Sequence, residues 1–281
     1  MNHKHYLIAL DLDGTLLQNN KEISAYNQEV ISQAKKEGHI VVIATGRSHL
    51  TSMQYYELLQ LNTAMINYNG AYIHHPFDDK WGPAIKNPIS KQTALQIIDK
   101  CYDLDMHNIW VESQHNILLD QHDEEIIDIF HAIHRKKGDV PISIGRIKDQ
   151  LNEHPISLLI HPRKNHIGTL KHYLDNHFYE SVEYRIWGEP WNFFEIVKKG
   201  MSKAFGLQKL SQYYNIPQER MIAFGDEDND LEMINYVGTG VAMANGISEL
   251  KSIADHITLT NENDGVGSFL ADYFQFQIKV G

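Results

Sequence analysis

The sequence is almost without cysteine, since Cys101 is the single one among 281 residues. One cysteine can form neither an internal disulfide framework nor a cysteine-rich zinc site, so both kinds of cross-link are excluded. A chain that uses neither is typical of a reducing compartment, and we expect a cytoplasmic protein. Cys101 itself is expected to be a small buried apolar residue.

Long apolar runs and clusters of basic residues are also lacking. No stretch approaches the roughly 20 apolar residues that span a bilayer, and the first apolar run is too short and too soon acidic for a signal peptide. The formal net charge is -11, with 25 Lys and Arg against 36 Asp and Glu. Because nucleic-acid binders need clustered basic side chains, we expect neither a nucleic acid nor a membrane as partner. The oligomeric state stays open.

An apolar fraction of 42% is present, over a length that allows two domains. Near the N-terminus, the apolar run 6–10 leads directly into Asp11 and Asp13. A short aliphatic run that ends at a turn signal predicts a buried β-strand. Two carboxylates at its end are costly unless a cation, a proton or a substrate uses them, although Asp and Gly also form ordinary turns.

Helices and strands alternate after this run. The pattern predicts a helix, a strand, a helix and a strand in turn, over residues 24–37, 39–44, 48–60 and 64–67. Ser24 and Ser48 can cap the two helices, and Thr45 follows the strand between them. Such alternation predicts an α/β fold with a parallel sheet, in which ligands bind beyond the carboxyl ends of the strands.

The pattern changes between residues 74 and 88, where Pro76, Pro83 and Pro88 lie in one loop. The next hundred residues predict paired strands and helices without regular alternation, which favours an inserted α+β domain over residues 84–198. The expected helices cover residues 91–104, 123–137 and 167–178, and the expected strands cover a hairpin at 109–120 and residues 156–161, 182–187 and 193–197.

The alternating pattern returns after the insertion. Ser202 can cap a helix that starts with Lys203, and an apolar strand over 221–224 runs directly into the acidic segment 225–230. A further strand over 240–243 and a terminal helix follow. One domain is therefore expected from residues 1–83 and 199–281, with 84–198 inserted into it.

Carboxylate and amide oxygens gather at the ends of these expected strands. Asp11 and Asp13 follow the first, and Asp226, Asn229 and Asp230 follow a later one. Hard oxygen ligands without His or Cys favour Mg²⁺ over zinc. Two unit charges at ~4 Å repel by roughly 4 kcal/mol at an effective dielectric of 20, so converging carboxylates require a cation. An exposed acidic loop is the alternative explanation for the later segment taken alone.

Four segments, in chain order, resemble the four motifs of the haloacid dehalogenase-like (HAD) superfamily: Asp11-Leu12-Asp13-Gly14-Thr15-Leu16, Thr45-Gly46-Arg47, Lys203 and Gly225-Asp226-Glu227-Asp228-Asn229-Asp230. The long insertion between the second and third motifs is similar to that of the Cof-type branch, subfamily IIB. The resemblance implies an α/β, Rossmann-like parallel-sheet core with an inserted α+β cap domain of type C2B.

The resemblance also implies a role for each matched residue. Asp11 would be the nucleophile that forms an aspartyl-phosphate, and Asp13 would be the general acid and then the general base. Thr45 would donate a hydrogen bond to a phosphoryl oxygen, and Lys203 would hold the nucleophile. The implied Mg²⁺ ligands are Asp11, the backbone carbonyl of Asp13, and Asp226, with Asn229 and Asp230 supporting the metal shell.

By this resemblance, the chain is expected to be a Mg²⁺-dependent hydrolase of phosphoric monoesters, acting on a small phosphorylated metabolite such as a sugar phosphate or a phosphorylated cofactor. Two alternatives stay open. One is a phosphomutase or phosphotransferase, in which a sugar hydroxyl accepts the phosphoryl group. The other is a catalytically silent metabolite sensor that retains the fold.

Several residues near the motifs stay outside the predicted site. Glu227 and Asp228 depart from the smaller or less acidic residues that the family often has there. Arg47, Asn69 and Asn245 are explained equally well as salt-bridge or turn residues. Within the insertion, one stretch is explained either by contact with a leaving group or by core packing: Trp187, Glu189, Trp191 and Asn192. The pair His131 and His134 is explained either by metal binding or by a solvated helix face.

Overall fold

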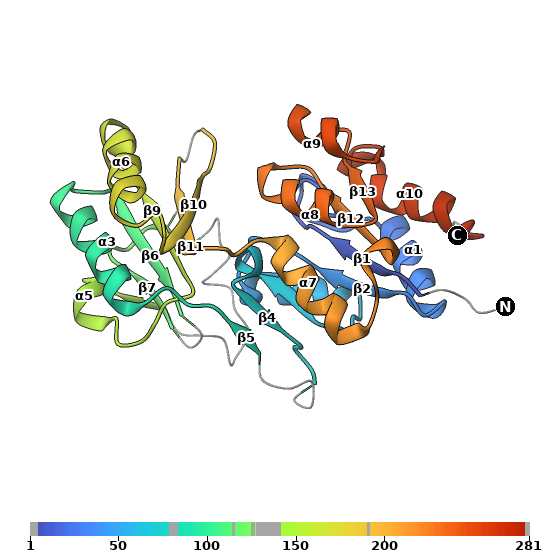
Figure 1. The fold of residues 1–281 in the computed structure, drawn as a ribbon, viewed down its shortest axis with the longest axis horizontal. Coiled ribbons are helices and arrows are strands. Elements are labelled where there is room, and N and C mark those ends of the chain that lie inside the picture. Colours follow the sequence, from blue (N-terminus) through green and yellow to red (C-terminus); the bar gives the residue numbers. More distant parts are fainter. Residues whose placement is uncertain are drawn as a thin grey trace. The chain divides into compact units, whose positions relative to one another are not determined.

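The computed structural model describes residues 5–78, 84–113, 116–124, 127, 142–189 and 192–278. The chain divides into two compact units, each with its own main sheet (Figure 1). The first unit joins Met1–Ile85 to Ser202–Gly281, and the second unit is Lys86–Met201. These divisions lie two and three residues beyond the expected ones, which followed residues 83 and 198.

A five-stranded parallel sheet organises the first unit, in the order β14-β13-β12-β1-β2. Its strands are Leu7–Leu10 (β1), Ile40–Ile43 (β2), Met221–Gly225 (β12), Thr239–Ala242 (β13) and His256–Ile257 (β14). Leu10 of β1 lies opposite Phe224 on one side and Ile43 on the other. Because the strands are parallel, the segments that follow these residues emerge at the same edge of the sheet.

Helices cover both faces of this sheet. They are Ala25–Lys36 (α1), His49–Leu58 (α2), Lys203–Tyr214 (α7), Leu231–Tyr236 (α8), Ser248–Ile253 (α9) and Gly265–Phe274 (α10). Ile8 and Leu10 share a buried cluster with residues of α1, α2 and α10, whereas Leu7 and Ala9 share another with residues of α7, α8 and α9. The expected strand, buried on both faces, is confirmed.

Three of these helices begin where the sequence placed their caps. The side-chain oxygens of Ser24, Ser48 and Ser202 each accept a hydrogen bond from the backbone N–H three residues on, at 3.0, 3.2 and 3.2 Å. Ser202 thereby fixes the start of α7 and the position of its first residue, Lys203. The short elements α8, α9 and β14 were not predicted.

The third predicted strand leaves the main sheet. Met65–Asn67 (β3) pairs antiparallel with Tyr72–His74 (β4) in a three-stranded sheet that also contains Ile85–Lys86 (β5). β3 still lies beside the end of β2, through a parallel bridge between Ala44 and Ile66. The predicted strand is therefore confirmed, and the turn at Tyr68–Gly70 then sends the chain back to form the antiparallel pair with β4.

The second unit is a six-stranded sheet in the order β10-β11-β9-β6-β7-β8, antiparallel except where β7 meets β8. Its strands are Asn108–Glu112 (β6), Ile117–Leu119 (β7), Ile142–Ile144 (β8), Ser157–His161 (β9), Val182–Ile186 (β10) and Phe194–Lys198 (β11). Its helices are Lys91–Asp103 (α3), Ile147–Gln150 (α5) and Ile167–His177 (α6). Alternate sheet residues, including Val111 and Ile160, pack in one cluster with Ile97 of α3 and Leu170 of α6. The expected α+β architecture is therefore confirmed.

A few predictions of local structure had other outcomes. Most of the helix expected over 123–137 lies outside the described residues, and β8 and α5 were not predicted. Short 3₁₀ helices cover Tyr68–Gly70, Lys164–His166, Gln218–Arg220, Asp228–Asp230 and Asn261–Asn263. In the part of the chain that the structure describes, no helix has both the length and the apolar character needed to cross a membrane.

Candidate active site

The carboxylate of Asp11 meets the ammonium group of Lys203 at the carboxyl end of β1. Lys203 Nζ donates hydrogen bonds to Asp11 Oδ1 at 2.7 Å and to Asp230 Oδ1 at 2.6 Å. Lys203 and Asp230 are 0% exposed, and Asp11 is 5% exposed. The structure therefore brings together three residues of three predicted motifs.

The charges of this group influence one another strongly. Burial acts to lower the pKa of Lys203, but the carboxylates of Asp11 and Asp230 outweigh it, and the pKa lies above its ordinary value. Burial holds the pKa of Asp11 well above its usual range, although Lys203 opposes this, and the charges of Asp230 and Asp226 raise it further. A second positive charge at this place would favour the ionised form of Asp11.

Asp226 follows β12 and lies beside the same group. The hydroxyl of Thr15 donates to Asp226 Oδ1 at 2.7 Å. Asp230 Oδ2 accepts hydrogen bonds from the backbone N–H groups of Asp226 and Glu227, at 3.0 and 3.1 Å. Burial raises the pKa of Asp226 to about 7, against the lowering effect of the Thr15 hydrogen bond. The ionised form of Asp226 is thus unfavourable without a nearby cation.

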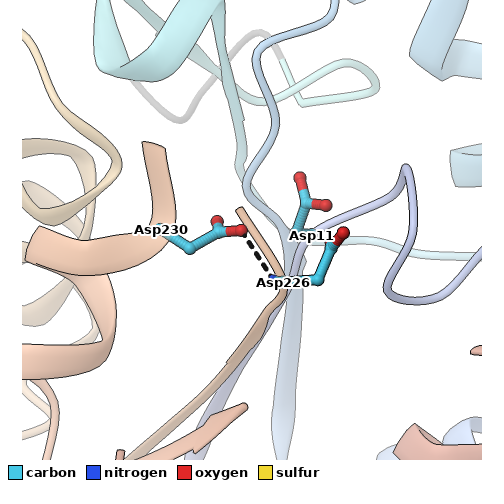
Figure 2. Close-up of side chains that lie close together, drawn as sticks. All are labelled: Asp11, Asp226 and Asp230. Carbon is cyan, nitrogen blue, oxygen red and sulfur yellow. Dashed lines mark hydrogen bonds between the residues drawn. The ribbon is translucent and has the colours of Figure 1, made fainter. Parts of the chain in front are cut away.

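Asp11, Asp226 and Asp230 form a cluster whose carboxylate oxygens, one from each residue, lie within 4.8 Å of one another. Figure 2 shows Asp11 and Asp226 next to each other, with Asp230 hydrogen bonded to the backbone of Asp226. An all-oxygen donor set, in which burial raises the pKa values of Asp11 and Asp226, fits a hard divalent cation. Because Lys203 and two N–H groups already use the oxygens of Asp230, Asp11 and Asp226 are better placed to bind an ion directly.

Gly14 allows the two acidic segments to approach. Its φ is +73°, and a Cβ atom at this position would lie 2.1 Å from Oδ2 of Asp226. The amide of Asn245 donates to the Gly14 carbonyl at 2.7 Å, which ties a third strand-end loop to this turn. Only glycine combines this backbone conformation with the close approach.

Asp13 lies in a different setting from Asp11. Its Oδ2 accepts a hydrogen bond from Arg47 Nε at 2.5 Å, and its Oδ1 accepts from Arg47 Nη2 at 2.7 Å and from Lys21 Nζ at 2.8 Å. Although burial acts to raise the pKa of Asp13, Arg47 and Lys21 together hold it well below its usual range. The Asp13 side chain is therefore ionised and paired with two cations, and it is not part of the carboxylate cluster.

Thr45 and Asn229 are held by the loop that follows β3. Thr45 is 1% exposed, its hydroxyl accepts from the N–H of Arg47 at 3.1 Å, and its carbonyl accepts from the N–H of Asn69 at 3.2 Å. The amide of Asn229 donates to the side-chain oxygen of Asn69 at 3.0 Å. Tyr68 and Asn69 have φ values of 49° and 50°, a left-handed conformation that is uncommon outside glycine. This strained turn links the second and fourth motifs.

Several residues that contact the predicted site were left outside it, among them Asn69 and Asn245 and also Arg47, Thr15 and Lys21. Arg47 was set aside as a salt-bridge or turn residue, and it does form a salt bridge, but with Asp13. Thr15 could have been found, since it lies two positions after Asp13 on the same turn as Gly14. The sequence around Lys21 gave no indication of a functional role, because only the turn at residues 18–22 brings its side chain back to Asp13.

In the second unit, the structure describes most of the stretch for which contact with a leaving group was considered, including Trp187 and Glu189. Trp187 Nε1 donates to Glu195 Oε2 at 3.0 Å, and the indole packs edge-on against Phe193, with ring centroids 5.5 Å apart. Glu189 is ion-paired with Lys164 at 3.4 Å. Trp191, His131 and His134 lie outside the described residues.

Comparison with known proteins agrees with this geometry. A family model for haloacid dehalogenase-like hydrolases matches residues 8–270. The chain is 43% identical over 274 residues to the 5-amino-6-(5-phospho-D-ribitylamino)uracil phosphatase YitU of Bacillus subtilis (strain 168), covering 98% of this chain and 99% of that one. A haloacid dehalogenase-like hydrolase from Bacteroides thetaiotaomicron has the same fold, with a TM-score of 0.80 and 26% identity over 96% of this chain and 100% of that one. A HAD subclass IIB sugar phosphatase also has the same fold, with a TM-score of 0.77 and 22% identity over 96% of this chain and 99% of that one.

The matched range contains all four motifs and spans both units. The α/β fold, the resemblance to the haloacid dehalogenase-like superfamily and the enzyme class expected from the sequence are confirmed by these similarities. The chain belongs to the haloacid dehalogenase-like hydrolase family.

Proposed function

We propose that this protein is a Mg²⁺-dependent phosphatase that hydrolyses a small-molecule phosphate monoester through an aspartyl-phosphate on Asp11. The observation that carries the proposal is the contact of Lys203 with both Asp11 and Asp230, beside Asp226, at one edge of the parallel sheet. A buried carboxylate fixed by a lysine is a positioned nucleophile. Its neighbours can bind a divalent cation and a phosphate.

Asp11 and Asp13 divide the chemistry between them. A carboxylate oxygen of Asp11 attacks phosphorus, the bond from phosphorus to the leaving oxygen breaks, and that oxygen takes a proton from Asp13. Water then loses a proton to Asp13 and attacks the aspartyl-phosphate. The bond from phosphorus to Asp11 breaks, and inorganic phosphate leaves with both carboxyl groups restored.

The protonation state of Asp13 changes during this cycle. Arg47 and Lys21 keep it ionised in the structure, which suits the base that receives a proton from water. To act first as an acid it must take up a proton, and an incoming phosphate dianion raises the pKa of a nearby carboxyl group. Thr45, at the end of β2, would donate its hydroxyl to a phosphoryl oxygen.

Asp11 and Asp226 would hold the Mg²⁺ ion, with the backbone carbonyl of Asp13 as a further ligand and with Asn229 and Asp230 in support. When bound, the ion supplies positive charge that offsets the repulsion between the phosphate and the carboxylates. Lys203 neutralises Asp11 and Asp230 and restrains the orientation of Asp11. The cytoplasmic location expected from the cysteine content stays a prediction.

For the substrate, we propose 5-amino-6-(5-phospho-D-ribitylamino)uracil, the ester named for the relative that shares 43% of its residues over 98% of this chain. The test is release of inorganic phosphate, with and without Mg²⁺, from this ester, a sugar phosphate, pyridoxal 5′-phosphate and 4-nitrophenyl phosphate. The ester with the highest kcat/KM identifies the substrate class, because discrimination is measured by that ratio. Asp11→Asn is the matched control.

Each outcome of this test has a definite meaning. Phosphate released by the wild type at rates far above Asp11→Asn supports the proposal, and a higher kcat/KM for another ester overturns the substrate only. An isomerised phosphosugar without free phosphate would identify a mutase. Tight binding of an ester without turnover would identify a sensor.

A further inference from the structure

We propose that Lys21 is a positioning residue for Asp13, acting together with Arg47 and Tyr55 in a group that we name the Asp13 clamp. The inference rests on the proposed phosphatase function, in which Asp13 transfers the proton. None of the three residues belongs to the carboxylate cluster at Asp11. The side chains of Lys21 and Arg47 instead donate hydrogen bonds to Asp13, and Tyr55 contacts both of these residues.

The clamp fixes both oxygens of the Asp13 carboxylate. Arg47 makes a two-pronged contact, with Nε at 2.5 Å from Oδ2 and Nη2 at 2.7 Å from Oδ1. Lys21 Nζ adds a third hydrogen bond, to Oδ1 at 2.8 Å. A planar guanidinium sets the plane of the carboxylate, and a lysine on one oxygen opposes rotation out of that plane.

The backbone around Lys21 is built to direct its side chain at Asp13. Lys21 has a φ of 66°, in the left-handed region, and its N–H donates to the carbonyl of Gln18 at 2.9 Å. Gln18 in turn donates to the carbonyl of Glu22 at 3.0 Å, which closes a tight turn. A non-glycine residue in this conformation carries a local cost, which the hydrogen bonds of the turn and of the Lys21 side chain offset.

Tyr55 connects the two cations of the clamp. Its hydroxyl donates to the carbonyl of Lys21 at 3.0 Å, and its ring lies under the guanidinium of Arg47, 5.4 Å from the ring centroid to Cζ. Tyr55 comes from α2 and is 5% exposed, whereas the Lys21 side chain is 50% exposed. A buried aromatic residue thus supports both the turn that carries Lys21 and the guanidinium of Arg47.

This arrangement predicts that the effect of losing the clamp on kcat/KM depends on the leaving group of the ester. A poor leaving group, such as an alkoxide, needs a proton at the moment that its bond to phosphorus breaks, so the orientation of Asp13 matters. 4-Nitrophenolate leaves without that proton. Loss of the clamp should therefore slow phosphoenzyme formation from an alkyl ester much more than from 4-nitrophenyl phosphate.

The experiment compares Lys21→Met with wild type on two esters, 4-nitrophenyl phosphate and the best alkyl ester of the panel above. We expect kcat/KM for the alkyl ester to fall about 10-fold or more, with a change within about 3-fold for the aryl ester and for both KM values. Lys21→Arg should restore most of the ratio, and Tyr55→Phe should lower it by an intermediate amount. Lys36→Met is the matched control, since Lys36 is 63% exposed and lies 3.9 Å from Glu29.

Several results would overturn the clamp. Equal losses on the two esters, or no loss in Lys21→Met, would show that Lys21 does not act through proton transfer. A raised KM for both esters would make Lys21 a phosphate-binding residue instead. If the wild type hydrolyses neither ester, the proposed function itself fails and the clamp fails with it.

Discussion

Lys203 Nζ lies 2.7 Å from Asp11 Oδ1, although the two residues are 192 positions apart in the chain. The lysine side chain is 0% exposed, and a second carboxylate, that of Asp230, contacts it from another element at 2.6 Å. A buried cation between two buried carboxylates offsets the cost of their burial, and removal of the cation leaves both carboxylates uncompensated. The site is thereby coupled to the stability of the fold.

Lys203→Met should therefore destabilise the protein as well as abolish turnover. We expect the free energy of unfolding to fall by about 3–5 kcal/mol, the usual cost of breaking a buried ion pair from one side. Urea unfolding at pH 7 without metal measures this. Lys209→Met, on the same helix, should cost less than about 1 kcal/mol, since it loses a contact with the Phe205 ring. Equal effects of the two variants would contradict the prediction.

Asp11→Asn should separate chemistry from folding. The amide oxygen can still accept a hydrogen bond from Lys203, so the thermal unfolding midpoint should stay within a few degrees of the wild-type value. Phosphate release should fall by at least about 10³-fold, because the nucleophile is lost. A variant that keeps activity within about 10-fold of the wild type would exclude Asp11 as the nucleophile, because loss of the nucleophile costs far more than that.

The stability of the metal-free protein should fall as pH rises from 4 to 7, through the pKa of Asp226 at about 7. Below its ordinary pKa of 3.8, Asp226 is protonated in both states; between the two values the folded protein holds a proton that the unfolded chain has released. The contribution of Asp226 to the free energy of unfolding is therefore fully present at low pH. It is lost as Asp226 ionises in the folded protein, by up to roughly 4 kcal/mol. Urea unfolding across this range checks it, and Asp226→Asn should show a shallower slope.

Mg²⁺ should reverse this trend. The ion binds the ionised carboxylates, so it should raise the unfolding midpoint more at pH 8 than at pH 5. Removal of metal with a chelator should restore the lower midpoint. In Asp226→Asn the effect of Mg²⁺ should largely disappear. A wild-type midpoint that does not respond to Mg²⁺ at pH 8 would argue against the carboxylate cluster as the metal site.

Gly14→Ala should be more damaging than its backbone conformation alone explains. The new Cβ would lie 2.1 Å from Asp226 Oδ2, so Asp226 would have to move in addition to the strain at a φ of +73°. We expect a loss of about 2–5 kcal/mol and a weaker response to Mg²⁺. Gly200→Ala is the matched control, because Gly200 has a φ of +81° and no atom within 4 Å of an added Cβ. It should cost only about 1–2 kcal/mol.

The local elements of the first unit could be predicted because their signals are local. Ser24, Ser48 and Ser202 cap their helices as expected, and the apolar runs form β1, β2 and β12. The predicted strand β3 is confirmed too, but its antiparallel pairing with β4 was not predicted, because strand propensity does not say which strand is the partner. Short elements such as α8 and β14 were missed, since a few residues hold too little periodicity to detect.

The sequence by itself determined which family the chain resembles, because four short motifs occur in the order that this family has, and the resemblance implied chemistry on a phosphate. Only the tertiary structure decided which carboxylate meets which cation. Asp11 and Asp13 are two positions apart, yet one contacts Lys203 and the other contacts Arg47 and Lys21. The physical reason is that ion pairing depends on distance and burial, and the fold sets both by bringing distant strand ends to one edge.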